Sequence, residues 1–130
     1  MMGSYTLVNN LAITSTSVYT YRNNTAISLV PVANNSQPVY VNGSVPVTSY
    51  LIMVYNGGNQ NLTVQLIGNI DATQKYPDYN MGNAYTVPAG ASIGIPLNFA
   101  DYPINYASVA LSYTTAPTSG SVSGYLYTYY

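Results

Sequence analysis

Apolar and polar residues alternate with a period of two near the end of the chain. In residues 106–115, Val109 and Leu111 alternate with the small residues Ser108, Ala110 and Ser112. In residues 121–130, Val122 and Leu126 alternate with Ser123 and with the tyrosines at 125, 127 and 129. This period predicts strands with one buried and one exposed face. Residues 116–120, APTSG, have the composition of a turn. We therefore predict a β-hairpin whose inward face is formed by Val109, Leu111, Val122 and Leu126.

The same alternation recurs along the whole chain between short clusters of Asn, Gly, Pro and Ser. It predicts strands over residues 5–8, 11–21, 25–32, 39–41, 45–55, 62–70, 85–87, 91–99, 106–115 and 121–129. Many short strands with dense turn signals are typical of a sandwich. We predict an all-β fold, an antiparallel β-sandwich of eight to ten strands with jelly-roll or immunoglobulin-like topology. The length of 130 residues suits one domain, residues 1–130.

Three segments depart from simple alternation. Pro96 lies on the outward face of its strand and predicts an edge strand or a bulge. The segment 51–55, LIMVY, is apolar on both faces, so it is either a central strand covered on both sides or part of a contact surface. Asp71 and Lys75 have the spacing of a single helical turn, within the most polar connection, residues 71–84.

Charged residues make up only 4% of the chain, where about 25% is usual. The ionic residues are Arg22, Asp71, Lys75, Asp78 and Asp101. A surface of neutral hydroxyls and amides has little to titrate in acid, which predicts an acid-stable protein exposed to an external medium. Low charge equally suits a densely packed assembly, because each charge would have to be desolvated there. The sequence leaves both readings open.

This composition also bears on partners and location. Two cations and a net charge of −1 exclude a surface that binds nucleic acid by electrostatic attraction. The chain contains no apolar run of 18 residues, so we predict no membrane span. The first residues lack the basic and apolar segments of a signal peptide. Either an export signal has been removed or the protein leaves its cell without secretion, as a virion protein does at lysis.

Catalytic and metal-binding groups are scarce. Without His or Cys, the carboxylates of Asp71, Asp78 and Asp101 are the only candidates for general acid or base chemistry. Asp in a loop is usually turn chemistry, so we predict no enzyme and no cofactor. Asp78, Asn80 and Asn83 could assist a cation with carbonyl oxygens, but a solvated loop explains them equally well.

Four N-x-S/T sequons fall in predicted turns and permit glycosylation, without indicating it: Asn23, Asn34, Asn42 and Asn61.

Sixteen tyrosines are the second anomaly of the composition. Tyrosine combines a large apolar ring with a polar tip, which suits partly wet interfaces. Tyr125, Tyr127 and Tyr129 lie on one face of a predicted strand, where they could stack on a neighbouring subunit or on a carbohydrate; ordinary strand propensity is the alternative. We predict a subunit interface in which the terminal segments pair with a neighbour's sheet edge: Tyr5, Leu7, Tyr125, Tyr127, Tyr129 and Tyr130.

Residues 85–97, YTVPAGASIGIPL, and 106–125, YASVALSYTTAPTSGSVSGY, resemble the closing strands of small β-sandwiches in virion capsid, turret and spike proteins and in archaeal surface filaments. The neutral, Tyr/Asn/Thr-rich character is similar to virion and surface proteins of thermoacidophilic archaea. The resemblance implies a single jelly roll that works by assembly, with copies of itself and other structural proteins as partners, in a virion or on an extracellular surface. A pilus or thread subunit and a module that binds surface glycans remain alternatives.

Overall fold

The computed structural model describes residues 2–32, 40–41, 45–46, 49–97 and 104–129, and these are all-β. The described part of the chain contains no helix long and apolar enough to cross a membrane. The strands are β1 (Met2–Leu11), β2 (Val30–Pro31), β3 (Tyr40–Val41), β4 (Val45–Pro46), β5 (Ser49–Asn56), β6 (Leu62–Asn69), β7 (Tyr79–Asn80), β8 (Tyr85–Val87), β9 (Ser92–Leu97), β10 (Tyr106–Tyr113) and β11 (Val122–Tyr129).

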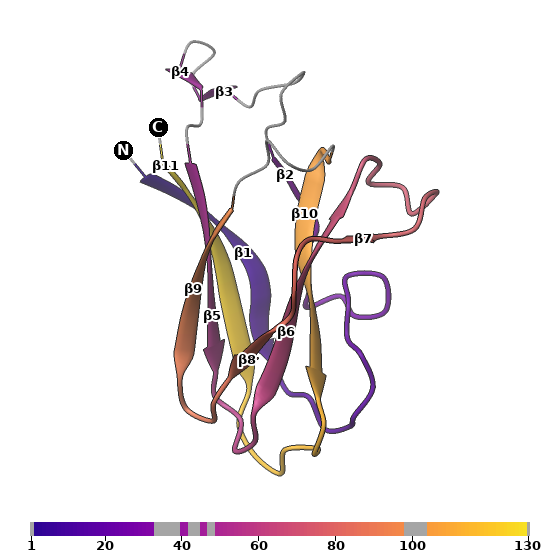
Figure 1. Cartoon of the computed structure of the whole chain (residues 1–130), viewed down its shortest axis with the longest axis vertical. Coiled ribbons are helices and arrows are strands. Elements are labelled where there is room, and N and C mark those ends of the chain that lie inside the picture. Colours follow the sequence, from indigo (N-terminus) through magenta and orange to yellow (C-terminus); the bar gives the residue numbers. More distant parts are fainter. Residues whose placement is uncertain (1, 33–39, 42–44, 47–48, 98–103, 130) are drawn as a thin grey trace.

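Two antiparallel sheets form a β-sandwich (Figure 1). One sheet has the order β1-β11-β5-β9, and the other has the order β2-β10-β6-β7, with β8 also paired to β6. The pairing is nested, because β1 pairs with β11, β2 with β10, β5 with β9 and β6 with β8. A long hairpin rolled up in this way is a jelly roll, which decides between the two topologies that the sequence left open.

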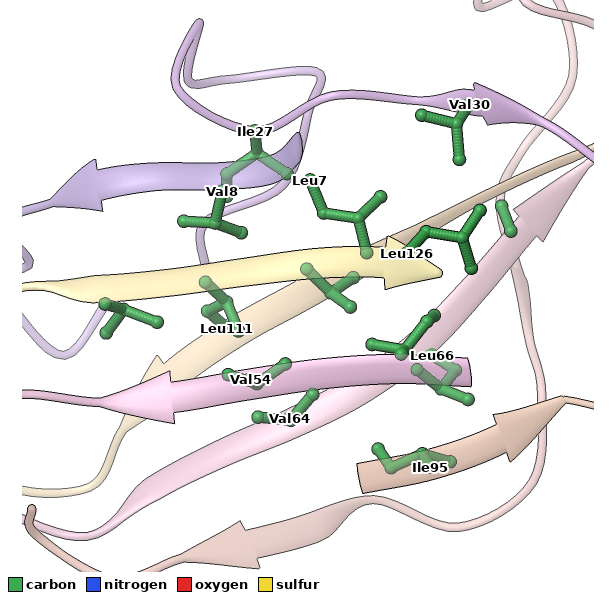
Figure 2. Packing of buried hydrophobic residues seen from close by; sticks show 14 of the residues in the cluster. Leu7, Val8, Ile27, Val30, Val54, Val64, Leu66, Ile95, Leu111 and Leu126 are labelled. Atoms are coloured by element: carbon green, nitrogen blue, oxygen red, sulfur yellow. The ribbon is translucent and has the colours of Figure 1, made fainter. Parts of the chain in front are cut away.

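The core lies between the two sheets and is built by the inward face of each strand. Along β5, Tyr50, Ile52 and Val54 are buried while the residues between them are not. Figure 2 shows buried side chains from strands of both sheets gathered in this space, among them those of Leu111 and Leu126. The alternation in the sequence thus becomes a continuous apolar layer.

The predicted hairpin over residues 106–130 is wrong. β10 pairs with β2 and β6, and β11 pairs with β1 and β5, so the two strands belong to opposite sheets. Val109, Leu111, Val122 and Leu126 are all buried as predicted, but they meet across the core. A period of two shows that one face is buried, and it does not show which strand lies alongside.

Residues 11–21 and 25–32 are also not the two strands that we predicted. Apart from short β2, this segment runs along the edges of both sheets: Tyr19 exchanges two backbone hydrogen bonds with Leu111 of β10, and the amide of Ser28 donates to Leu7 of β1. The segment therefore covers an edge of each sheet on one side of the sandwich. The predicted helical turn at Asp71 is a turn in which the carboxylate accepts from the amide of Thr73 (2.9 Å).

Asn56, at the end of β5, joins the loops at one end of the sandwich. Its side chain is fully buried, donates to the carbonyl oxygens of Gln60 (2.8 Å) and Val87 (2.9 Å), and accepts from the amide of Gly58 (3.1 Å) and the hydroxyl of Tyr113 (2.5 Å). All four hydrogen-bonding positions of this amide are therefore used. The contacts tie β5, β8 and β10 to one side chain.

The connection between β10 and β11 packs backbone against backbone at the same end. The amide of Gly57 donates to the carbonyl oxygen of Ser121 (2.9 Å). Gly120 has a φ of +91°, and a Cβ there would lie 1.9 Å from the carbonyl oxygen of Gly57. Only glycine satisfies both the conformation and the space at this crossing between the sheets.

Candidate interaction surface

The outer face of the β1-β11-β5-β9 sheet carries a row of tyrosines along β11. Tyr125 and Tyr127 lie beside Met53 and Leu51 of β5, and on the other side they lie beside Thr6 and Ser4 of β1. Across β5, the face continues to Gly94 and Pro96 of β9. We call this surface the tyrosine face: Ser4, Thr6, Ser49, Leu51, Met53, Tyr55, Ser92, Gly94, Pro96, Ser123, Tyr125, Tyr127 and Tyr129.

Large aromatic side chains on this face remain open to solvent. Tyr129 is 56% exposed, Tyr55 49% and Tyr125 39%, while Tyr127, Leu51 and Met53 are half-buried. The rings of Tyr125 and Tyr127 lie 6.2 Å apart at 47° to each other. This tilted arrangement is a favourable geometry for an aromatic pair. The two rings together present an apolar ridge with polar tips.

A shallow hollow of about 350 Å³ lies at one end of the tyrosine face, between β5, β9 and β11. Leu51, Pro96, Tyr127 and Tyr129 line it and give it a mainly apolar surface. None of the four strands of this sheet contains a charged residue. Contact with another neutral surface would therefore desolvate no ionic group of this sheet.

The structure places the six predicted interface residues differently. Tyr125, Tyr127 and Tyr129 share the outer face, as predicted. Tyr5 is 43% exposed but lies opposite Leu126, on the core side of β1 at the rim of the sandwich. Leu7 is fully buried in the core, so it is not part of the exposed surface. Tyr130 lies outside the described residues.

Sequence reasoning did not assign Leu51, Met53, Tyr55 and Pro96 to a surface together with the tyrosines. The signal was the segment 51–55, apolar on both faces, for which a contact surface was one of two predicted explanations. The predicted edge position of Pro96 is confirmed, because its strand β9 pairs only with β5 among the described strands. The sequence could not show that β5 and β11 pair side by side in one sheet.

The opposite outer face, on β6, β8 and β10, has a different chemistry. A hollow of about 340 Å³ there is lined entirely by neutral amide and hydroxyl side chains. One lining residue, Asn59, exchanges hydrogen bonds with Thr118 (2.7 and 3.0 Å). This hollow therefore differs from the mainly apolar hollow on the tyrosine face. The residues of this second hollow are Asn59, Gln60, Asn61, Thr63, Thr86, Thr114 and Thr115.

Arg22 and Asp78 form a bidentate ion pair that joins two loops. Arg22 Nε donates to Asp78 Oδ2 (2.9 Å) and Nη2 donates to Oδ1 (3.1 Å). Oδ1 also accepts from the hydroxyl of Tyr21 (2.5 Å) and from Asn69 Nδ2 (3.1 Å). Arg22 Nη2 donates further to the carbonyl oxygen of Tyr76. The cluster fixes the loop after β6 against residues 20–24.

These contacts shift two pKa values. Burial alone would raise the pKa of Asp78, but the hydrogen bonds from Arg22, Tyr21 and Asn69 outweigh it and hold that pKa below its usual value. Burial and the hydrogen bond to Asp78 raise the pKa of Tyr21 to about 12. Asp78 is thus a carboxylate, and Tyr21 a neutral donor, over the whole physiological range.

The carboxylates considered for chemistry are engaged in these structural roles. Both oxygens of Asp78 accept hydrogen bonds, and the carboxylate of Asp71 accepts from the amide of Thr73, which lowers its pKa. Asp101 lies outside the described residues. Asn80 and Asn83, the other candidates for a cation, are exposed in the loop that contains β7, and the described residues hold no cluster of acidic side chains suited to a metal.

Two of the four sequons can be placed. Asn23 is exposed, and its side chain accepts from the amide of Thr20 (2.8 Å) and donates to the carbonyl oxygen of Val18 (3.0 Å). Asn61 is exposed at the start of β6 and lines the polar hollow. Asn34 and Asn42 lie outside the described residues. Of these two described sequons, Asn23 is held in its turn by side-chain hydrogen bonds, and Asn61 faces the polar hollow.

Comparison of the chain with models of known protein families, with curated proteins and with solved structures finds no match.

Proposed function

We propose that the protein is a non-enzymatic structural subunit of an extracellular assembly, a viral capsid, turret or decoration protein, in which the tyrosine face contacts other copies of the chain. The observation that carries this proposal is an exposed aromatic and apolar face on a sheet without any charged residue. Interfaces are enriched in Tyr and Met and depleted of charge at their centres, and this face has that composition.

Two further features support the proposal. Viral capsid domains are among the proteins built as jelly rolls, although the same fold also serves lectins and other functions. The chain carries two basic and three acidic residues, so copies can pack densely with few charges to desolvate. A surface filament subunit would use these features in the same way, and a full-length gene with an upstream export signal would favour it over the virion.

The proposal is tested by placing one charge on each outer face. We expect the wild-type chain to self-associate, as measured by light scattering after gel filtration and by negative-stain microscopy at pH 7 and pH 4. At pH 7, Tyr125→Glu should weaken this association at least 100-fold, because a carboxylate buried in a neutral contact costs several kcal/mol. Thr86→Glu, on the exposed opposite face, is the matched control and should assemble like the wild type.

A wild-type chain that stays monomeric at high concentration at both pH values would refute this function. An equal loss of assembly in Tyr125→Glu and Thr86→Glu would also contradict it. Circular dichroism of both variants checks that each keeps its fold.

A carbohydrate-binding module is the second candidate, favoured by one observation. The hollow lined by Asn61, Thr63, Thr86 and neighbouring amide and hydroxyl side chains offers neutral donors and acceptors, which suit sugar hydroxyls. A glycan array distinguishes the candidates: binding that Thr86→Glu abolishes and Tyr125→Glu leaves intact would favour the module. An array without binding, together with ordered assembly, would exclude it.

A further inference from the structure

Three stretches of sheet edge are covered by other backbone or carry a proline. The edge of β10 pairs with β2 and with Tyr19. The second half of β1 is covered by residues 26–28, where Asn9 donates to the carbonyl oxygen of Ala26 and Ser28 donates to that of Leu7. The edge strand β9 contains Pro96, which has no amide proton to offer to a further strand. Covering and proline are standard means of preventing unwanted strand pairing.

The first half of β1 has no such protection. Residues 2–6 pair in regular register with β11, from Met2 opposite Tyr129 to Thr6 opposite Tyr125. The register shifts in β1 begin only after Thr6, in the half of the strand that residues 26–28 cover. Among the described residues, no strand or loop pairs with the other side of residues 2–6. Figure 1 shows β1 and β9 at opposite ends of their sheet.

The free half of β1 also lacks the side chains that keep edges apart. Its sequence, MGSYT, contains no charged residue and no proline, and Ser4, Tyr5 and Thr6 are all exposed. A regular edge strand directs the amide and carbonyl groups of every second residue away from its sheet. These groups form a short template for one more antiparallel strand.

We propose that residues 2–6 of β1 pair with the same residues of a second copy, antiparallel and about a two-fold axis, so that two four-stranded sheets become one eight-stranded sheet. This inference rests on the proposed function and specifies how two copies of the chain contact each other. A second copy is the occupant that the edge itself favours, because an uncharged strand does not repel its own copy and an isologous contact needs only one type of surface. The pairing also joins the two tyrosine faces into a single surface.

Symmetry makes the proposal specific. An axis perpendicular to the sheet places one residue of β1 opposite its own copy, with Cβ atoms about 4.5–5.5 Å apart. That separation is close to what a disulfide bond spans. The chain contains no cysteine, so a single introduced cysteine reports on one position only.

The test is a scan of Gly3→Cys, Ser4→Cys and Tyr5→Cys, with Thr86→Cys on the opposite outer face as control. After mild oxidation we expect a covalent dimer in high yield at one of the three β1 positions and not at Thr86. In parallel, Tyr5→Lys places a charge on the exposed edge but off the tyrosine face, so it should weaken self-association at least tenfold in light scattering, while Thr86→Lys should not. Unchanged melting temperatures show that the lysine variants remain folded.

The outcomes separate this inference from the function on which it rests. Assembly that persists in Tyr5→Lys at wild-type strength overturns the edge pairing and leaves contact through the tyrosine face intact. Cross-linking at Thr86 as efficient as at β1 shows random collision and also overturns it. A wild-type chain that remains monomeric refutes the proposed function as a whole.

Discussion

The hydrogen bond between Tyr113 and Asn56 gives the sharpest stability prediction. In Tyr113→Phe the ring remains and only the buried hydroxyl is lost. The acceptor, Asn56 Oδ1, keeps its bond from the amide of Gly58 (3.1 Å), so no polar group is left unpaired. We therefore expect the loss of one net hydrogen bond, a decrease of about 1 to 1.5 kcal/mol in the free energy of unfolding.

Asn56→Ala should lower the free energy of unfolding more than Tyr113→Phe does, because it removes all the hydrogen bonds of the Asn56 side chain at once. The hydroxyl of Tyr113 and the carbonyl oxygen of Val87 lose their bonds to this side chain inside the protein. We expect a loss of about 3 kcal/mol or more. In that background Tyr113→Phe should cost almost nothing, which gives a coupling energy of about 1 to 1.5 kcal/mol in a double-mutant cycle.

Urea denaturation followed by circular dichroism measures these differences for all four chains of the cycle. In thermal melts, a chain of this length loses about 4 °C for each kcal/mol. Tyr125→Phe is the control, because its hydroxyl lies on an exposed side chain and its removal should change stability by less than about 0.5 kcal/mol. Equal costs of Tyr113→Phe in both backgrounds, or a cost no larger than that of Tyr125→Phe, would refute the reasoning.

Gly120→Ala should lower the free energy of unfolding by about 3 kcal/mol or more, because the new Cβ would meet the carbonyl oxygen of Gly57. Gly90→Ala, at φ +75° in open space, is the control and should lower it by only about 1 kcal/mol. Equal losses of stability for the two variants in thermal melts would contradict this. The raised pKa of Tyr21 means that the folded chain keeps its proton above pH 10 while the unfolded chain loses it, so this stabilisation falls between pH 10 and about 12. Allowing for partial exposure, the stability gap between wild type and Tyr21→Phe should shrink by about 1 to 2 kcal/mol over that range, and a constant gap in urea titrations would be the opposing result. The lowered pKa of Asp78 gives the opposite pH dependence. The ionised carboxylate stabilises the fold above about pH 4, and this stabilisation is lost as the pH falls through the pKa of the folded state. The difference in the free energy of unfolding between wild type and Asp78→Asn should therefore stay constant from pH 7 to 5 and disappear in stronger acid.

Local pattern predicted most of the long strands and their buried faces, but it was wrong for residues 11–21 and 25–32 and missed β7. The period of two located Val109, Leu111, Val122 and Leu126 in the core, and the same period placed Tyr125 on an outer face. It did so because the alternation of a strand is a property of neighbouring residues. The all-β class followed from the number of such segments.

Long-range partners could not be predicted in the same way. Arg22 and Asp78 are 56 residues apart, and β10 and β11 are consecutive in sequence yet lie in opposite sheets. Asn56 stands before Gly57 in a cluster of turn residues, but it continues the inward face that runs through Tyr50, Ile52 and Val54. Its inward position in the alternation of β5 was the signal in the sequence that this polar side chain is buried and needs several hydrogen-bond partners.

An uncharged sheet has one further consequence for recognition. Without charged residues on β1, β5, β9 or β11, electrostatic complementarity cannot set the orientation of a partner on this sheet. Strand register can, because main-chain pairing along β1 fixes the neighbouring strands at spacings of about 4.8 Å. The tyrosine rows of two paired copies would then lie three spacings apart, about 14 Å, with β1 and its copy between them. In the proposed assembly, edge and face would therefore act together, since the edge would set the geometry in which the tyrosines meet the next subunits.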